Sequence, residues 1–215
     1  RRLASEGSRP KLPWAPALRE FIKNPSPVLP ILENLKNDES EYVRKSVANH
    51  LNDISKTHPE LVLTIASKWI GTTKNTDWIV KHSLRTLLKK GDKQALAIFK
   101  LEDASKITVK ELTLAKESIC IGDDLFFSFT LVNESNRVRK LRLEYKIAYV
   151  KANGSTSKKV FKLSELSLEK GTSKNFTRKQ RFTDFTTRKH YPGLHEVIIV
   201  VNGEDKCKKT FMVTN

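Results

Sequence analysis

The fold of this chain is decided where its hydrophobic pattern changes, at Ile107-Thr108-Val109-Lys110-Glu111-Leu112-Thr113-Leu114. Apolar and polar side chains largely alternate along this stretch, which is typical of a half-buried β-strand. Before it, from Pro13 to about Lys100, apolar residues recur with the period of an amphipathic helix. The change predicts a multidomain α and β protein, with a helical part over residues 1–104 and a β part over residues 105–215.

Six further segments of the β part repeat this alternation, and turn residues separate them. They lie at 125–132, 141–149, 159–166, 175–182, 194–201 and 208–213. Turns are expected at Gly122-Asp123, Asn133-Glu134-Ser135, Asn153-Gly154, Gly171 and Asn202-Gly203, of which Asn202-Gly203 is the strongest hairpin signal. About seven short strands in about 110 residues fit an immunoglobulin-like β-sandwich, and we predict that architecture.

The helical part carries an internal repeat. Helices are expected near 14–23, 26–36, 40–57, 59–70, 75–90 and 92–99. Glu41-Tyr42-Val43-Arg44-Lys45-Ser46-Val47 aligns with Asp77-Trp78-Ile79-Val80-Lys81-His82-Ser83, and the other helices recur at a similar spacing. Helix pairs repeated at this spacing predict a HEAT-like α-helical repeat solenoid. Because so few pairs are present and the chain begins at Arg1, we expect only the C-terminal part of that solenoid.

Two stripes are expected on the helix over 40–57. The apolar stripe predicts a core face, and its members are Val43, Val47, Leu51 and Ile54. The stripe beside it is polar, and with its equivalents in the repeat it comprises Tyr42, Ser46, Asn49, Asp53, Trp78, His82, Arg85 and Lys89. Stacked repeats place equivalent positions side by side, so we predict one recognition surface. Ordinary roles stay open for three of these residues: Trp78 in the core, His82 as a solvated side chain, and Asp53 as a solvated or capping side chain.

The charge of the chain favours a polyanionic partner. The formal net charge is +16, and Lys and Arg exceed Asp and Glu in both halves. Nucleic acid is the commonest partner for such an excess, although a solubilising surface explains it too. The basic residues of the β part either track phosphates or protect edge strands, and they include Arg137, Arg139, Lys140, Arg142, Arg178, Lys179 and Arg181.

Several function classes find no support in the sequence. No apolar run approaches the roughly 20 residues that a membrane helix needs. The five histidines lack the spacing of a zinc site, and there is no P-loop or hydrolase nucleophile motif. Cys120 and Cys207 are more typical of buried free thiols in a reducing compartment than of a disulfide. We therefore expect a cytoplasmic protein without a metal, a cofactor or a membrane partner.

Three stretches of the helical part carry a resemblance to a known family. They are Glu6-Gly7-Ser8-Arg9-Pro10-Lys11-Leu12-Pro13-Trp14-Ala15, Glu41-Tyr42-Val43-Arg44-Lys45-Ser46-Val47-Ala48-Asn49-His50-Leu51-Asn52-Asp53-Ile54 and Asp77-Trp78-Ile79-Val80-Lys81-His82. They resemble the HEAT-repeat alkylpurine DNA glycosylases of the AlkC and AlkD type. The resemblance is closest to the AlkC type, some members of which carry a C-terminal immunoglobulin-like domain.

This resemblance implies a DNA repair enzyme that hydrolyses the N-glycosidic bond of alkylated bases such as 3-methyladenine and 3-methylcytosine. An alkylated base is a good leaving group, and a carboxylate stabilises the positive charge that develops on the sugar. By motif, Glu6 and Asp53 match the catalytic carboxylates. The implied DNA-binding residues are Arg9, Trp14, Arg44, Lys45, Trp78, Lys81, His82 and Arg85. The implied partner is double-stranded DNA that contains alkylated bases. We also expect the protein to be a monomer.

Two other functions remain open at the level of the sequence. A non-catalytic nucleic-acid-binding protein would use the same surface, with Glu6 and Asp53 in structural roles. A protein-interaction scaffold would lack the steep salt dependence that phosphate contacts give to DNA affinity. The resemblance also implies an N-terminal half of the helical domain that these 215 residues lack. We therefore expect the chain on its own to be inactive or impaired.

Overall fold

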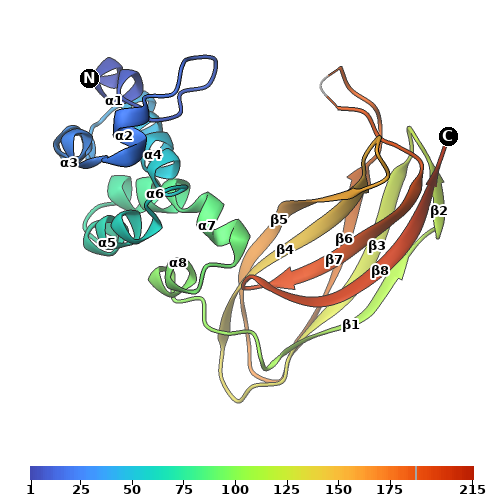
Figure 1. Cartoon of the computed structure of the whole chain (residues 1–215). Coiled ribbons are helices and arrows are strands. Elements are labelled where there is room, and N and C mark those ends of the chain that lie inside the picture. Colours follow the sequence, from blue (N-terminus) through green and yellow to red (C-terminus); the bar gives the residue numbers. More distant parts are fainter. Residues whose placement is uncertain (187) are drawn as a thin grey trace. The chain divides into compact units, whose positions relative to one another are not determined.

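The computed structural model describes residues 1–186 and 188–215, and they form two units of different secondary structure. The first unit is Arg1–Phe99 and the second is Lys100–Asn215. The first unit is helical and the second is built from strands (Figure 1). Over the parts of the chain that are described, no helix is long and apolar enough to cross a membrane.

The first unit is made of short helices joined by turns. Its described residues form α1 (Arg2–Gly7), α2 (Arg19–Lys23), the 3-10 helix η1 (Ser26–Val28), α3 (Leu29–Leu35), α4 (Glu41–Ile54), α5 (Pro59–Trp69), α6 (Lys74–Ser83), α7 (Arg85–Lys90) and α8 (Lys93–Ile98). Residues that start and end helices explain several of these bounds. Pro59 begins α5, Thr73 caps α6 in a capping box, and Gly91 ends α7 in the left-handed conformation.

Helix α4 is the centre of the first unit. It packs against α1, α3, α5 and α6. The predicted core face of α4 is confirmed, because its four apolar residues are buried, and these are Val43, Val47, Leu51 and Ile54. Burial of a side chain of this size contributes roughly 1.5–3 kcal/mol. The apolar face of α4 therefore fixes the positions of the helices around it.

The predicted HEAT-like α-helical repeat solenoid is wrong. Within residues 1–186 and 188–215 no helical solenoid is seen, and strands hold more residues than helices. Only α4, α5 and α6 reach ten residues, since prolines and turns interrupt the other expected helices. Pro13 and Pro16 leave residues 14–18 outside any helix, so α2 begins only at Arg19. The expected helix over 75–90 is split at Leu84 into α6 and α7.

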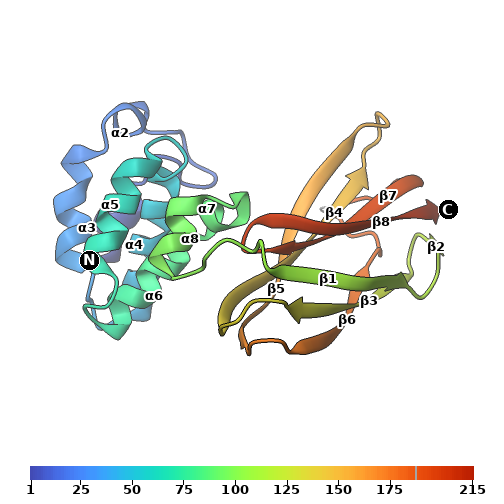
Figure 2. The same cartoon turned by 90° about the horizontal axis from the view of Figure 1, so that it is seen from below.

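The second unit consists of two sheets that pack face to face (Figure 2). One sheet has the strand order β1-β3-β6 and the other the order β2-β8-β7-β4-β5. The strands are β1 (Ile107–Leu114), β2 (Ser118–Cys120), β3 (Asp124–Asn133), β4 (Arg139–Val150), β5 (Thr156–Leu168), β6 (Ser173–Arg181), β7 (Gly193–Val201) and β8 (Glu204–Thr214). All seven predicted strands overlap observed strands. Only the three-residue β2, which pairs with β8 in parallel, was not predicted.

The hairpin between β7 and β8 confirms the predicted Asn202-Gly203 turn. Both residues have positive φ, at 47° and 81°, as a two-residue hairpin turn of the primed type requires. The buried Asn202 side chain also fixes the segment that enters the sandwich. Its Oδ1 accepts from the backbone N of Arg142 at 2.7 Å, and its Nδ2 donates to the carbonyl of Glu102 at 2.7 Å.

The two cysteines are free thiols, as the sequence favoured. Their expected burial is wrong: Cys120 on β2 is exposed and Cys207 on β8 is half-buried. Both lie on strands at or next to the edge of the five-stranded sheet, where the pleat turns their side chains away from the core.

We predict opposite outcomes for two neighbouring phenylalanines of β3. Phe127 is 1% exposed in the core between the sheets, whereas Phe126 points outward and is 45% exposed. Phe127→Ala should lower the free energy of unfolding by about 3–5 kcal/mol, because it leaves a cavity. Phe126→Ala is the matched control and should lower it by less than about 1 kcal/mol. Denaturant unfolding of the sandwich measures both, and equal losses would contradict the inward register of Phe127.

Candidate functional site

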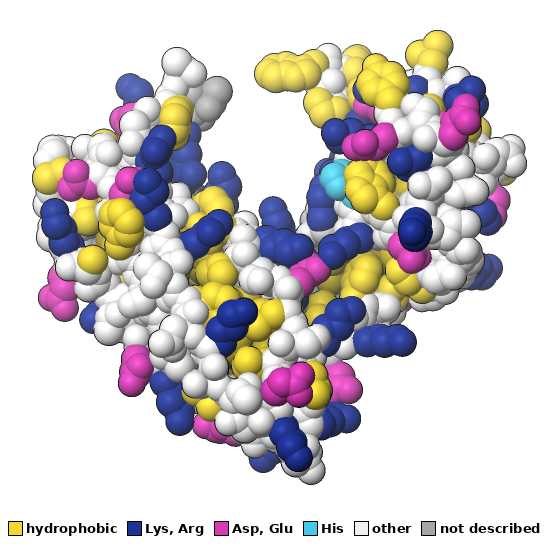
Figure 3. All heavy atoms as spheres, turned by 180° about the vertical axis from the view of Figure 1, so that it is seen from behind, with side chains coloured by type: hydrophobic (Ala, Val, Ile, Leu, Met, Phe, Trp, Pro, Cys, Tyr) yellow, Lys and Arg dark blue, Asp and Glu magenta, His cyan; other side chains and the backbone are white. Residues whose placement is uncertain are grey.

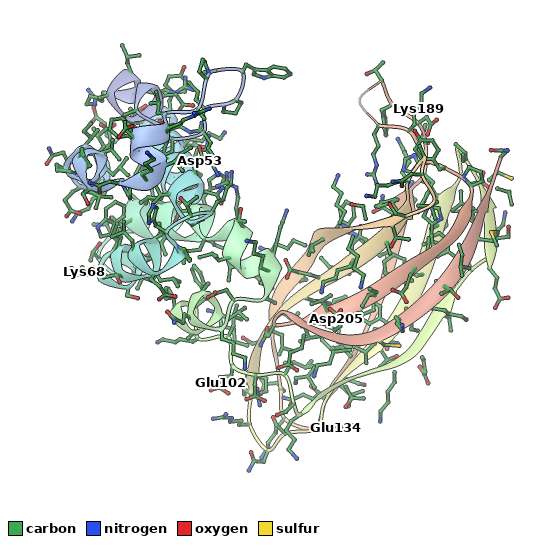
Figure 4. The ribbon with its side chains drawn as sticks, in the orientation of Figure 1. Asp53, Lys68, Glu102, Glu134, Lys189 and Asp205 are labelled. Atoms are coloured by element: carbon green, nitrogen blue, oxygen red, sulfur yellow. The ribbon has the colours of Figure 1, made fainter. Side chains whose placement is uncertain are left out.

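Two carboxylates from distant parts of the chain meet in the first unit. Glu6 lies in the last turn of α1. Asp53, which is labelled in Figure 4, lies in the last turn of α4. Arg9 follows α1 and reaches both of them. The structure therefore brings the two predicted catalytic residues together around one guanidinium.

The Arg9 side chain is almost completely buried, at 8% exposure. Its Nε and Nη2 donate to Oδ2 of Asp53 at 2.9 and 2.7 Å, and its Nη1 donates to Oε1 of Glu6 at 2.6 Å. These are short, charge-assisted hydrogen bonds. The sequence assigned Arg9 to a DNA phosphate, but its guanidinium lies between the two carboxylates.

The second carboxylate oxygen of Glu6 accepts a hydrogen bond from a serine of α4. The Ser46 hydroxyl donates to Oε2 of Glu6 at 2.6 Å and lies 3.0 Å from the hydroxyl of Ser5. Burial acts to raise the pKa of Glu6, but the hydrogen bonds from Ser46 and Arg9 outweigh it and hold the pKa below its usual value. Glu6 is therefore ionised at neutral pH.

Asp53 has a second cationic neighbour. Nζ of Lys56 donates to its Oδ1 at 2.9 Å, so both carboxylate oxygens of Asp53 accept from cations. The two partners differ in accessibility, because the Lys56 side chain is 39% exposed while that of Arg9 is buried. The ion pair of Asp53 with Lys56 is therefore open to solvent, whereas its ion pair with Arg9 is not.

His50 anchors α1 to α4 directly beneath this cluster. Its Nδ1 lies 2.9 Å from the carbonyl oxygen of Ser5, the residue before Glu6, so Nδ1 carries the proton and donates. Its Nε2 is buried without a hydrogen-bond partner. Burial, aided by the positive charge of Arg9, lowers the pKa of His50 from 6.5 to about 4. His50 is accordingly neutral at pH 7.

Trp14 lies in the loop that leaves this cluster. The loop runs from Pro10 to Leu18 and is closed by a backbone hydrogen bond between these two residues at 3.0 Å. The Trp14 side chain is fully exposed, and its backbone has a φ of 65°, a conformation that non-glycine residues rarely adopt. A fully exposed tryptophan on a strained backbone needs an explanation outside the fold, since neither feature stabilises the unit.

The predicted surface formed by α4 and its repeat is present in part. Asn49 on α4 accepts at Oδ1 from Nη2 of Arg85 at 3.0 Å and from Nε2 of His82 at 3.3 Å. The rings of His82 and Trp78 stack at 5.1 Å. Burial lowers the pKa of His82 and that of Arg85, and the charge of Asp53 opposes the shift of Arg85. Asp53 and Ser46, however, are buried and do not belong to that surface.

The remaining predicted DNA-binding residues differ in orientation. Arg44 is half-buried, and its Nη1 donates to the carbonyls of Asp38 and Glu39, both at 2.8 Å. Lys45 and Lys81 are exposed on α4 and α6. Figure 3 shows Lys and Arg side chains spread over the visible faces of both units. Arg44 thus orders the turn before α4, whereas the two lysines face solvent.

Sequence reasoning missed the supporting residues of the cluster, which are Ser5, Ser46 as a ligand of Glu6, and His50. A histidine is hard to place from sequence alone, because it occurs both in the core and at the surface. The i, i+3 spacing of Glu6 and Arg9 was an available signal for their ion pair. No group of three or more His, Cys, Asp and Glu side chains suited to a metal ion occurs in the described part of the chain.

We predict that acid destabilises the first unit through His50. An unfolded histidine binds a proton below about pH 6.5, whereas folded His50 does so only near its pKa of about 4. The contribution of neutral His50 to the free energy of unfolding is complete above pH 6.5. About 2–3 kcal/mol of that free energy should be lost by about pH 4.5. His50→Gln should lack this component, so its unfolding free energy should vary less between pH 7 and about 4.5 in chemical denaturation. Parallel pH profiles for the two proteins would contradict the assignment.

Comparison with known proteins places an Ig-like domain in the C-terminal part of the chain, where the second unit lies. Residues 108–215 match the protein family described as "Uncharacterised protein YhaZ, C-terminal Ig-like domain". The YhaZ protein of Bacillus subtilis (strain 168) is 55% identical over 213 residues, which make up 99% of this chain and 59% of that protein. The chain thus spans less than two thirds of the length of this relative.

A solved structure matches both units together. It is the Pseudomonas fluorescens alkylpurine DNA glycosylase AlkC bound to DNA containing an abasic site analog, with 43% sequence identity and a TM-score of 0.96. The match covers 100% of this chain and 60% of that chain. The likeness to the AlkC type that the sequence predicted is therefore confirmed in structure. Because the YhaZ match extends over half of the residues, this chain belongs to the family defined by the YhaZ C-terminal Ig-like domain.

Proposed function

We propose that this protein is a DNA repair glycosylase that releases alkylated bases, including 3-methyladenine and 3-methylcytosine, from double-stranded DNA. The observation that carries the proposal is the cluster of Glu6 and Asp53 around Arg9, next to the loop of Trp14. The match to an alkylpurine DNA glycosylase bound to DNA supports it. In this proposal the protein acts as a monomer in the cytoplasm, where its free thiols persist.

The chemistry needs no strong general acid. Alkylation of the ring nitrogen makes the base cationic, so it leaves readily and its departure places positive charge on the deoxyribose. Ionised carboxylates in a site of low dielectric constant stabilise such a charge electrostatically. Glu6 suits this role, because its hydrogen bonds hold its pKa low and its side chain is 20% exposed.

Asp53 supplies the second negative charge. Its Oδ1 pairs with Lys56, whose half-exposed side chain leaves when a cationic substrate approaches. Its Oδ2 stays bound to Arg9 inside the unit. In this proposal the positive charge of the sugar replaces that of Lys56 beside Asp53 during the reaction.

DNA is held by the solvent-facing residues around the cluster. Lys45 and Lys81 contact phosphates, and Arg85 and His82 lie beside them on the surface that Asn49 orders. The net charge of +16 favours the approach of DNA from a distance. Trp14 and the stacked Trp78 present aromatic faces, which favour a cationic base or sugar.

We predict that Asp53→Asn in the full-length protein abolishes base release while DNA binding persists. Loss of one preorganised electrostatic contact lowers a rate by about 100-fold or more. Free 3-methyladenine and 3-methylcytosine are counted by mass spectrometry after incubation with methylated duplex DNA. Glu41→Gln is the matched control, because it removes one exposed carboxylate from the same helix, and its rate should match the wild type.

The outcome for the wild-type protein separates the alternatives. Binding of methylated DNA without any base release would establish a nucleic-acid-binding protein. Affinity for DNA that does not change with salt would favour a protein-interaction scaffold, because phosphate contacts make affinity fall steeply as salt rises.

We predict that Trp14→Ala separates function from stability. The side chain is fully exposed, so its loss should change the free energy of unfolding by less than about 0.5 kcal/mol. Base release should fall by about tenfold if the ring contacts the cationic base or sugar. Trp69→Ala is the contrasting variant: Trp69 is buried, and its loss should destabilise the first unit by about 3–5 kcal/mol. Unchanged base release by Trp14→Ala would remove this residue from the site.

A further inference from the structure

We propose that Arg9 is a positioning residue that fixes the two carboxylates of the site relative to each other, and that it is not a ligand of DNA phosphate. This inference rests on the proposed glycosylase function and assigns a role that residue type alone does not suggest. It starts from the three hydrogen bonds that join Arg9 to Asp53 and Glu6, at 2.6 to 2.9 Å.

The geometry leaves Arg9 little with which to bind a phosphate. All three of its nitrogens donate to carboxylates, and the side chain is 8% exposed. To reach a phosphate, the guanidinium would have to abandon the buried carboxylate of Asp53 and the partly exposed carboxylate of Glu6. Leaving a buried charge without its partner is strongly destabilising, which disfavours such a movement.

The two carboxylates need such a residue. Glu6 belongs to α1 and Asp53 to α4, so the two carboxylates come from different helices, and their like charges repel. The guanidinium is planar and presents its donors in a rigid fork, so it sets both the separation and the orientation of its partners. Arg9 follows α1 directly, which makes it the link between α1 and the end of α4.

The charge balance is compatible with the reaction. Glu6, Asp53 and Arg9 together carry one net negative charge. That charge remains available to a cationic sugar once Lys56 leaves Asp53. A positioning role for Arg9 therefore reduces repulsion within the pair without removing the electrostatic attraction on which catalysis depends.

Arg9→Lys in the full-length protein tests the inference, because it keeps the charge and loses the fork. Base release should fall by about 100-fold in kcat, since misplacement by about 1 Å has an effect of that size. KM and the salt dependence of DNA affinity should stay at wild-type values. Arg1→Lys is the matched control: the exposed Arg1 pairs with Asp38 and not with Glu6 or Asp53, and both constants should remain unchanged.

The opposite result identifies a phosphate ligand. In that case KM rises and kcat is retained, because the paired contacts of the guanidinium with the phosphate are lost. If the wild-type protein is active, this result overturns the positioning role of Arg9 and leaves the glycosylase proposal standing. A wild-type protein that releases no base overturns the glycosylase proposal and this inference with it, so the two failures are distinguishable.

A second measurement does not depend on the folding of the variant. The Nε–H signal of Arg9 in the nuclear magnetic resonance spectrum of the wild-type protein reports on its hydrogen bond to Asp53. The chemical shift of this signal and the slow exchange of its proton with water should persist when undamaged duplex DNA is added. Loss of the slow exchange together with a shift that saturates with DNA binding would overturn the inference.

Discussion

A buried guanidinium requires negative partners, and in the first unit this requirement ties together three segments of the chain. Arg9 satisfies it with Asp53 at the end of α4 and with Glu6 at the end of α1. The carboxylates in turn need further donors, which Ser46 and Lys56 provide. Removal of Arg9 or Asp53 leaves its buried partner with an uncompensated charge, where the penalty is several kcal/mol. The same contacts that hold α1 against α4 therefore also define the site.

Helix α4 connects the core of the first unit with its candidate chemistry. Its apolar face packs into the core, and its polar residues reach in two directions. Ser46 and Asp53 point beneath α1 into the carboxylate cluster, while Asn49 orders His82 and Arg85 at the surface. One helix thus places the buried anionic cluster next to a cationic and aromatic surface. This arrangement suits a reaction in which DNA is held by its phosphates while positive charge develops on one sugar.

Much of the sandwich could be predicted from sequence, because alternation and turn residues act locally. The Asn202-Gly203 turn needs positive φ at both positions, and few other sequences supply that. The solenoid could not be predicted correctly, because the repeated spacing did not reveal how Pro13, Pro16 and Leu84 interrupt the helices. In the candidate site, Glu6 and Asp53 were predicted by motif. The hydrogen bonds of Arg9 to Asp53 were missed, because partners 44 residues apart in the sequence are brought together only by tertiary packing.

The central claim is that ionised carboxylates stabilise a cationic sugar without a general acid. The most direct test is the pH dependence of single-turnover base release by the full-length protein, measured on methylated duplex DNA. Because the pKa of Glu6 is held low, the rate should be constant between about pH 6.5 and 8. A rate that increases steadily as the pH falls through this range would show that a protonated group drives the departure of the base, and would contradict the account.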